Sequence, residues 1–455
     1  MARAKIHPGI LRSLDDNPEA MSPLGTLNFL LVKPLNLIRA LVPAFLLICG
    51  MYFPTSIAGT FSEPLYLLHM AIFLGVCIFI ILMEGFVDSI AVLFAISIVA
   101  LLFGSSLMSE FHDYRPGGVT GFFCFAVLCC VPLRRMRASR SLLLAVNALN
   151  FIAGAGMILG NQTVDQLIRA HYSIYYPELL KIMILAHKPV LTFGTHSLAA
   201  MAFYLFFWLC LETYKAKKEW LFLASAILYA ALTLALTSVA GLAIGAIMVA
   251  QLAWGAINAG WGSRILTLLL TVAAIALASW TGIWALAKPV FSSDTNGLLG
   301  RYSGTGTLAW PLHYALNHPF SPIGFTYSPN FSFLGDSGAV QYFVRGSLPL
   351  LVCMYAAAYR FLRHNLLATS DAVRFIIVLA IFETGFTLLT QERSLYLLAF
   401  AVVYLNELRA PAEPHSEGHL EAREGERHRD HGLCRARDFI DLPRLCGDAS
   451  HEPFW

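Results

Sequence analysis

Charge is scarce in this sequence. Asp, Glu, Lys and Arg supply 13% of its 455 residues, about half the share of an ordinary soluble domain. Hydrophobic residues supply 57%, and a water-soluble fold of this size would expose large apolar patches to accommodate them. A membrane barrel needs segments of about ten residues that alternate in polarity, whereas stretches such as 265–286 are continuously apolar. We therefore expect an integral membrane protein built from helices.

Other absences exclude further classes. The net charge of +3 is too small to indicate a nucleic-acid partner. No Walker loop, dinucleotide fingerprint or metalloprotease helix is present. The long polar loops contain no cysteine, which excludes a disulfide framework and a thiolate nucleophile there; the cysteines within the apolar stretches are small buried hydrophobes, namely Cys49, Cys77, Cys124, Cys129, Cys130, Cys210 and Cys353.

Apolar stretches long enough to cross a bilayer recur along the chain. The hydrophilic start has no short apolar core, so the first stretch is expected to be an uncleaved anchor. Three stretches (the fourth, tenth and twelfth) are short, which leaves ten or eleven spans as alternatives to twelve. The expected spans are 35–53, 64–83, 86–107, 118–133, 141–160, 193–214, 220–237, 239–257, 265–286, 346–362, 373–390 and 394–409.

Basic residues in the short loops predict the orientation, because cytoplasmic loops carry an excess of Lys and Arg. With twelve spans these loops share one side, and both termini are cytoplasmic. Two long polar loops, about 161–192 and 287–345, then face the opposite side of the membrane. The basic residues are Arg134, Arg135, Arg137, Arg140, Lys215, Lys217, Lys218, Arg264 and Arg363.

We expect three regions: a cytoplasmic N-terminal segment (1–34), an all-α polytopic membrane domain (35–409) and a disordered cytoplasmic tail (410–455). The two long loops of the membrane domain are expected to form a partly helical cap. The tail is dense in Glu, Arg and His, a composition typical of disorder. Its His and Cys spacings match no standard zinc pattern, so we predict no metal site.

The larger loop carries the first candidates for chemistry. A connection this long is usually functional or disordered, and this one is too rich in aromatics for disorder. Arg301 follows Gly297 and Gly300, and its planar guanidinium suits a phosphate or pyrophosphate. Alternatively, Arg301 pairs with Asp294 or with lipid headgroups.

Four more residues of this loop are candidates. His313 or His318 could act as a general base near neutral pH or could be structural; helical character over 308–317 ends at His318. Asp336 either takes a proton from a sugar hydroxyl or caps a helix. Arg345 is a second phosphate contact or an interfacial anchor.

The smaller loop offers Arg169, Lys188 and His196. His196 lies at the mouth of the sixth span, where an ionisable residue is a functional candidate by default, although it could be a packing residue. Glu383 is expected midway through the eleventh span. There it would face a partner or a cavity, or be a protonated structural carboxyl.

Three segments together resemble the O-antigen ligase/polymerase superfamily of bacterial inner-membrane proteins. The first is 188–197 (KPVLTFGTHS) and the second is 235–245 (ALTSVAGLAIG). The third comprises Gly300-Arg301, Trp310, Pro319, Gly324, Asp336-Ser337 and Gly346. The family usually has Arg where Lys188 stands. Its ligases usually have a His-containing motif where Asp336-Ser337 stands, and this pair is more like the polymerases.

The resemblance implies a metal-independent glycosyltransferase without a cofactor, which polymerises undecaprenyl-pyrophosphate-linked oligosaccharides into an exopolysaccharide or O-antigen. Basic residues would hold the pyrophosphate, a base would activate the acceptor hydroxyl, and loop aromatics would stack on sugars. A flippase and a chain-length regulator are implied partners. The alternatives are an O-antigen ligase and, in another class, a transporter or flippase. Catalysis is assigned to Asp336, His318 and His196, and substrate binding to Arg301, Lys188, Arg345, Arg169 and Trp310.

Overall fold

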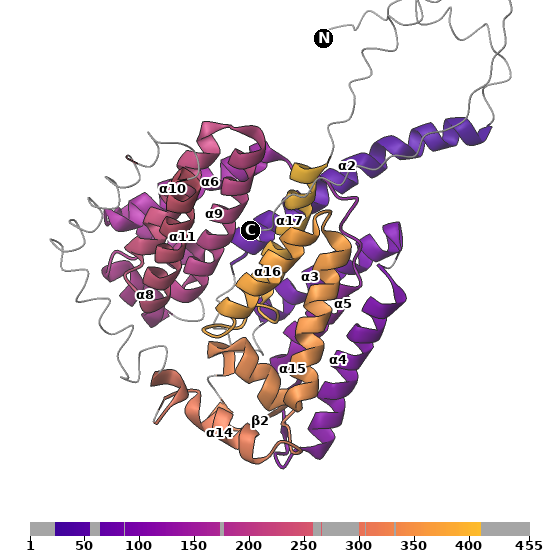
Figure 1. Cartoon of the computed structure of the whole chain (residues 1–455), viewed down its shortest axis with the longest axis vertical. Coiled ribbons are helices and arrows are strands. Elements are labelled where there is room, and N and C mark those ends of the chain that lie inside the picture. The colour runs from indigo at the N-terminus through magenta and orange to yellow at the C-terminus, as the bar shows by residue number, and fades with distance from the viewer. Residues whose placement is uncertain are drawn as a thin grey trace, which may run out of the picture. The chain divides into compact units, whose positions relative to one another are not determined.

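The computed structural model describes residues 23–54, 64–85, 87–172, 177–257, 265, 300–304, 306–331 and 334–410. Apart from their first residues, the span expected over 265–286 and the tail expected over 410–455 lie outside this part, as does Asp294. The described residues are almost entirely helical (Figure 1). Their one sheet pairs β1 (Asp113–Tyr114) with β2 (Thr326–Tyr327) in antiparallel register.

The helices follow the apolar stretches of the sequence. Each expected span that falls wholly within the described residues coincides with a helix, although bounds differ. The helices are α2 (Pro23–Tyr52), α3 (Pro64–Glu84), α4 (Ser89–Met108), α5 (Thr120–Cys129), α6 (Arg140–Ile158), α7 (Gln162–Tyr172), α8 (Pro177–Leu185), α9 (His196–Lys217), α10 (Trp220–Ala235), α11 (Val239–Ile257), α14 (Ala309–Asn317), α15 (Gly338–Asn365), α16 (Thr369–Phe382) and α17 (Glu392–Arg409).

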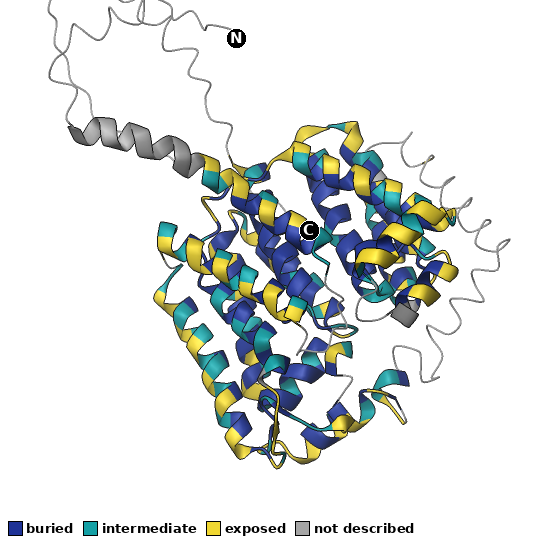
Figure 2. Ribbon diagram, turned by 180° about the vertical axis from the view of Figure 1, so that it is seen from behind, coloured by how far each residue is buried: buried dark blue, intermediate teal, exposed yellow. Residues whose placement is uncertain are grey.

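Four helices among the described residues, α3, α4, α6 and α9, are long and apolar enough to cross a membrane. Shorter apolar helices lie in α2, α5, α10 and α11. Helices α3, α4 and α6 carry exposed residues, which are yellow in Figure 2. Many of these exposed residues have large apolar side chains. These features support a helical membrane protein, whereas twelve spans and their orientation stay predictions.

Helix α9 forms the centre of the bundle. In its most apolar 18-residue segment, 89% of the residues are buried. The helix packs against α10, α11 and α17. A helix that is apolar all round is one that other helices surround. Because the candidate His196 is the first residue of α9, this central helix fixes its position.

Two expected spans need correction. The tenth was expected over 346–362, but α15 begins at Gly338 and breaks at Gly346 and Ser347, where Ser347 has a φ of 55°. Pro349 lies just beyond this break and cannot donate a helical hydrogen bond. The eleventh was expected to continue to residue 390, but α16 ends at Phe382. Glu383 therefore lies in a turn and not in mid-helix.

The larger loop is ordered where it is described. Helix α14 ends at His318, whose φ of −123° is not helical, as the following proline predicts. A small apolar core joins α14 to the start of α15, formed by Leu308, Tyr314, Ala315, Ile323, Phe331, Leu334, Val340 and Val344. The smaller loop contains α7 and α8, which contact each other. Both loops are thus partly helical, as expected, and their side of the membrane stays a prediction.

Candidate functional site

Arg301 lies in the 3-10 turn η3 (Gly300–Tyr302). The turn folds back on itself, because Leu308 N donates to the Arg301 carbonyl at 2.8 Å. A Cβ on Gly306 would lie 2.0 Å from the Gly300 carbonyl oxygen, so only glycine fits there. The Arg301 guanidinium makes one long hydrogen bond, from Nη1 to the Gly385 carbonyl at 3.5 Å. Among the described residues, no carboxylate lies within 4.0 Å of it.

The smaller loop brings two further basic side chains to Arg301. The charges of Lys188 and Arg301 both act on the His196 imidazole. Gly194 turns the chain at a φ of 69° just before His196, a left-handed conformation that glycine adopts at little cost. Within the described part of the chain, His196 Nδ1 is buried without a hydrogen-bond partner. We call Lys188 and Arg301, whose charges both act on His196, the cationic cluster.

A buried arginine that the sequence analysis missed holds this segment in place. Arg393 is fully buried at the start of α17. It donates to the Thr192 hydroxyl at 3.1 Å and to the carbonyls of Met51 at 3.3 Å and Phe53 at 2.5 Å. The adjacent ionisable residues Glu392 and Arg393, at the edge of an expected span, were the available signal.

Asp336 ends the 3-10 turn η5 (Leu334–Asp336), directly before α15. Its carboxylate accepts a hydrogen bond from Thr307 Oγ1 at 3.3 Å. Burial raises the pKa of the Asp336 carboxyl above its usual range, while the Arg301 charge and the Thr307 hydrogen bond oppose that rise. A carboxylate whose pKa moves towards the working pH is a better general base.

The capping interpretation of Asp336 is wrong. The N-cap of α15 is Ser337, whose side chain accepts a hydrogen bond from Val340 N at 3.4 Å. Tyr302, next to Arg301, places its hydroxyl 3.1 Å from Ser337 Oγ. The segments that carry Arg301 and Asp336 are therefore joined through their immediate neighbours.

Trp310, His313 and His318 form a second group, on and next to α14. Trp310 and His318 both stack on Tyr314, with ring centroids 5.6 and 4.8 Å apart. His318 Nδ1 is 3.9 Å from a Glu110 carboxylate oxygen, and His313 lies beside Asn317. These residues and the exposed Trp310 make an aromatic stack along α14, on which sugar binding stays a prediction.

Two predicted arginines lie apart from both groups. Arg345 is buried and donates to the Gly324 carbonyl at 2.5 Å, while Gly324 N donates to the Arg345 carbonyl at 2.8 Å. A residue buried in this way cannot anchor the chain at the lipid interface. Arg169 is exposed on α7, where its charge acts on Asp165.

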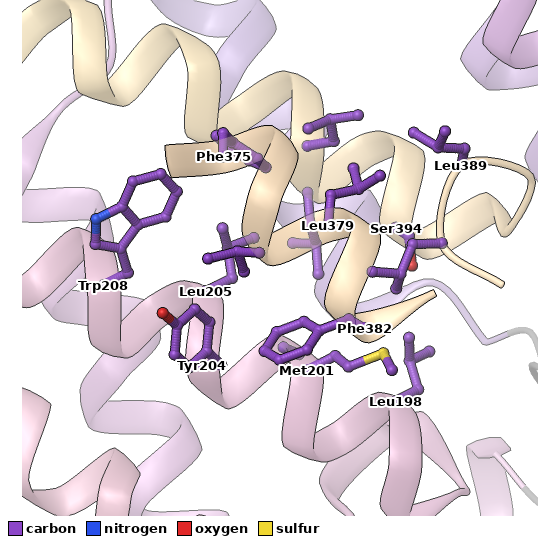
Figure 3. A pocket seen from close by; sticks show the side chains of 15 residues that line it. Leu198, Met201, Tyr204, Leu205, Trp208, Phe375, Leu379, Phe382, Leu389 and Ser394 are labelled. Atoms are coloured by element: carbon purple, nitrogen blue, oxygen red, sulfur yellow. The ribbon is translucent and has the colours of Figure 1, made fainter. Parts of the chain in front are cut away.

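An apolar groove lies between α9, α16 and α17 (Figure 3). Leu198, two residues after His196, and Phe382, just before Glu383, line one end of it. The groove follows α9 and α16 to Trp208 and Phe375. It holds about 70 Å³, room for only a few water-sized groups. Its lining is Leu198, Met201, Ala202, Tyr204, Leu205, Trp208, Phe375, Val378, Leu379, Phe382, Leu388, Leu389, Ser394, Leu397 and Leu398.

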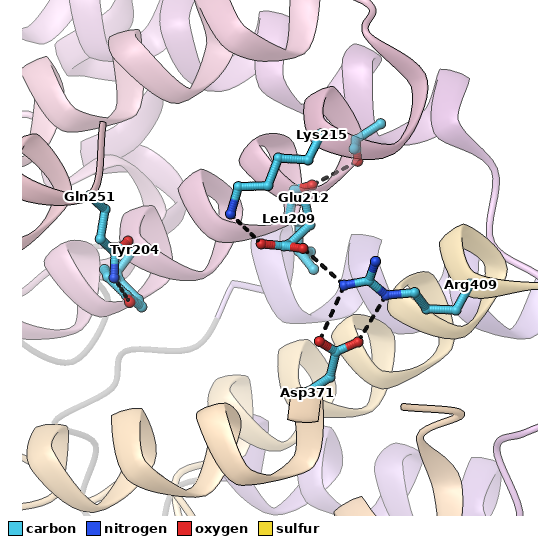
Figure 4. A network of polar contacts seen from close by, with 8 residues as sticks. Tyr204, Leu209, Glu212, Lys215, Gln251, Asp371 and Arg409 are labelled. Atoms are coloured by element: carbon cyan, nitrogen blue, oxygen red, sulfur yellow. Dashed lines mark hydrogen bonds and ion pairs between the residues drawn. The ribbon is translucent and has the colours of Figure 1, made fainter. Parts of the chain in front are cut away.

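A polar network joins α9, α16 and α17 at the ends that lie away from Leu198 and Phe382 (Figure 4). Arg409 at the end of α17 bonds Glu212 of α9 at 3.0 Å and Asp371 of α16 at 3.1 Å. Lys215 also bonds Glu212, at 2.8 Å. Both carboxylates are buried, so the network ties these helix ends together.

No protein-family model, curated protein or solved structure matches this chain.

Proposed function

We propose that this chain is a membrane glycosyltransferase that polymerises undecaprenyl-pyrophosphate-linked oligosaccharide units. The observation that carries the proposal is the contact between the segments of Arg301 and Asp336, in which Tyr302 lies against Ser337 and Thr307 donates to Asp336. Fixed cations near a carboxylate of raised pKa suit a reaction in which a pyrophosphate leaves as a hydroxyl attacks. The sequence resemblance points to the same chemistry.

In the proposed reaction, the acceptor hydroxyl oxygen attacks the anomeric carbon of the donor glycan. The bond between that carbon and the pyrophosphate oxygen breaks, and undecaprenyl pyrophosphate leaves with the bonding electrons. Asp336 takes the hydroxyl proton, while Arg301 and Lys188 stabilise the charge that develops on the leaving pyrophosphate. The growing glycan is thereby moved onto the new lipid-linked unit.

The apolar groove supports a lipid-linked donor. One of its lining residues, Leu198, is two residues after His196, and its lining is almost entirely apolar. Its volume of about 70 Å³ is too small for an oligosaccharide and would take only a short segment of a hydrocarbon chain. A donor whose pyrophosphate binds Arg301 would have its isoprenoid chain at the entrance of this groove.

A polymerase is favoured over a ligase because Asp336 and Ser337 stand where the ligases usually have a His-containing motif. The proposal includes a bacterial inner-membrane location, an extracytoplasmic site, and work alongside a flippase and a chain-length regulator. The oligosaccharide and the bilayer are the only partners that the reaction itself needs.

The proposal is tested with the purified full chain in lipid nanodiscs. Undecaprenyl-pyrophosphate-linked repeat units are added, and products are separated by glycan length. We expect a ladder of longer lipid-linked glycans together with free undecaprenyl pyrophosphate, unchanged by a metal chelator. Transfer to a different acceptor would instead indicate a ligase. Movement of the unchanged substrate across a vesicle membrane, without lengthening, would indicate a transporter and refute the proposal.

A further inference from the structure

The turn between α16 and α17 contains a fully buried glutamate, Glu383. Its Oε1 accepts a hydrogen bond from the Tyr342 hydroxyl at 2.5 Å. The same oxygen accepts from the backbone N–H groups of Leu388 at 3.0 Å and Leu389 at 2.9 Å. One carboxylate oxygen thus fixes both ends of the turn and attaches it to α15.

The backbone of this turn also holds the segment that carries Asp336. The Glu383 carbonyl accepts from Gly338 N at 2.8 Å and from Ser337 Oγ at 3.1 Å. Gly338 is the first residue of α15, and Asp336 directly precedes Ser337. The position of Asp336 therefore depends on where the Glu383 carbonyl lies.

The next two carbonyls hold the segment that carries Arg301. The Thr384 carbonyl accepts from the Tyr302 hydroxyl, and the Gly385 carbonyl accepts from Arg301 Nη1 at 3.5 Å. Three consecutive carbonyls thus receive donors from both halves of the site. The turn therefore helps to set the distance between Arg301 and Asp336, together with the contacts of Tyr302 with Ser337 and of Thr307 with Asp336.

The glutamate and the start of α15 are in close contact. A Cβ on Gly338 would lie 2.7 Å from Glu383 Cδ and 2.9 Å from both carboxylate oxygens. A separation under 3.0 Å forces atoms to move. Any side chain at position 338 would therefore push the carboxylate and its turn away from α15.

We propose that Glu383 is a positioning residue that holds Arg301 and Asp336 at the separation needed for glycosyl transfer; this inference rests on the proposed function. Glu383 touches neither the donor nor the acceptor. It acts through the turn, whose carbonyls bind the two segments. A carboxylate is costly to bury. The Glu383 carboxylate offsets this cost by accepting hydrogen bonds from Tyr342, Leu388 and Leu389.

The inference is tested by kinetics on Glu383→Ala and Glu383→Gln in the nanodisc assay. The amide oxygen of Gln can still accept from Tyr342 and the two N–H groups, so its kcat should stay within about fivefold of wild type. Alanine releases the turn, and a misplacement of about 1 Å costs on the order of 100-fold in rate. We expect that loss in kcat, with little change in the KM of the lipid-linked donor.

Glu212→Ala is the matched control. Glu212 is a buried, hydrogen-bonded glutamate at the opposite end of the bundle. Its replacement by alanine should therefore lower the melting temperature without lowering kcat. Gly338→Ala perturbs the contact between Gly338 and the Glu383 carboxylate from the side of α15. This variant tests the positioning role if Glu383→Ala does not fold. It should reproduce the loss in kcat.

The outcomes separate the two proposals. If the wild-type chain neither binds undecaprenyl pyrophosphate nor lengthens glycans, the proposed function fails. If the wild type is active but Glu383→Ala and Gly338→Ala keep a kcat within threefold of Glu212→Ala, the positioning role is wrong and Glu383 only stabilises the fold. A Glu383→Gln enzyme as impaired as the alanine variant would also overturn the inference, because the acceptor oxygen would not be what matters.

Discussion

Replacing Arg301 with alanine separates catalysis from folding more sharply than any other change. In the described structure the side chain makes one hydrogen bond, at 3.5 Å to the Gly385 carbonyl, and no ion pair. A bond of that length is weak, so its loss should cost less than about 1 kcal/mol of folding free energy. The melting temperature of Arg301→Ala should therefore stay close to that of the wild type.

The catalytic loss should be far larger. Removing one positioned donor from a site of developing charge costs on the order of 100- to 1,000-fold in kcat, or about 2.7–4 kcal/mol. Lys188 shares the same cluster and keeps part of the stabilisation, so we expect the lower end of that range. Arg301→Lys should recover only part of the rate, because an ammonium cannot reproduce the planar fork.

The assay is the initial rate of undecaprenyl pyrophosphate release at saturating donor. Arg140→Ala is the control, because Arg140 is a half-exposed arginine that pairs with Glu219, and a surface pair of this kind contributes little. It should show the wild-type kcat. An Arg301→Ala enzyme within threefold of wild type, with an intact fold, would show that the guanidinium does not stabilise the leaving group.

Three further predictions follow from the site and the bundle. If Asp336 is the base, the wild-type rate should fall as pH drops through a pKa above the ordinary carboxyl value of about 4, and Asp336→Asn should be folded but inactive; an active Asn variant would refute the role. Ala202→Phe narrows the groove and should raise the KM of the undecaprenyl-linked donor about tenfold but not that of a short-chain analogue; equal effects on both donors would argue against the groove. Arg409→Met leaves the buried carboxylates of Glu212 and Asp371 without this partner and should cost about 2 kcal/mol, less than the roughly 3–5 for a fully buried pair because Arg409 is partly exposed; an unchanged melting temperature would contradict this.

Much of the helical architecture could be predicted from local composition. Hydropathy located helices from α2 to α17, and Pro319 correctly predicted the end of α14 at His318. The span over 373–390 was wrong beyond Phe382. Apolar neighbours on both sides hid a turn there, although Gly385 and the threonines after it were the signal.

The site could be predicted only in part. Arg301, Lys188, His196 and Asp336 were each chosen for their side-chain chemistry, and in the structure the charge of Arg301 acts on both His196 and Asp336. Arg345 was chosen on the same grounds, yet its guanidinium bonds the Gly324 carbonyl. The sequence offered no means of distinguishing these arginines, because each is a cation beside glycine near an expected membrane surface.

The sequence by itself determined that this is a helical, strongly apolar chain with two polar loops, because burial of apolar side chains depends on composition and period alone. Only the tertiary structure decided which buried polar groups meet. The three carbonyls after α16 bind segments some 40 to 80 residues earlier in the chain, and Arg393 bonds the end of α2. Such pairs form because a buried donor must find an acceptor, and which acceptor lies within reach depends on the packing of the helices.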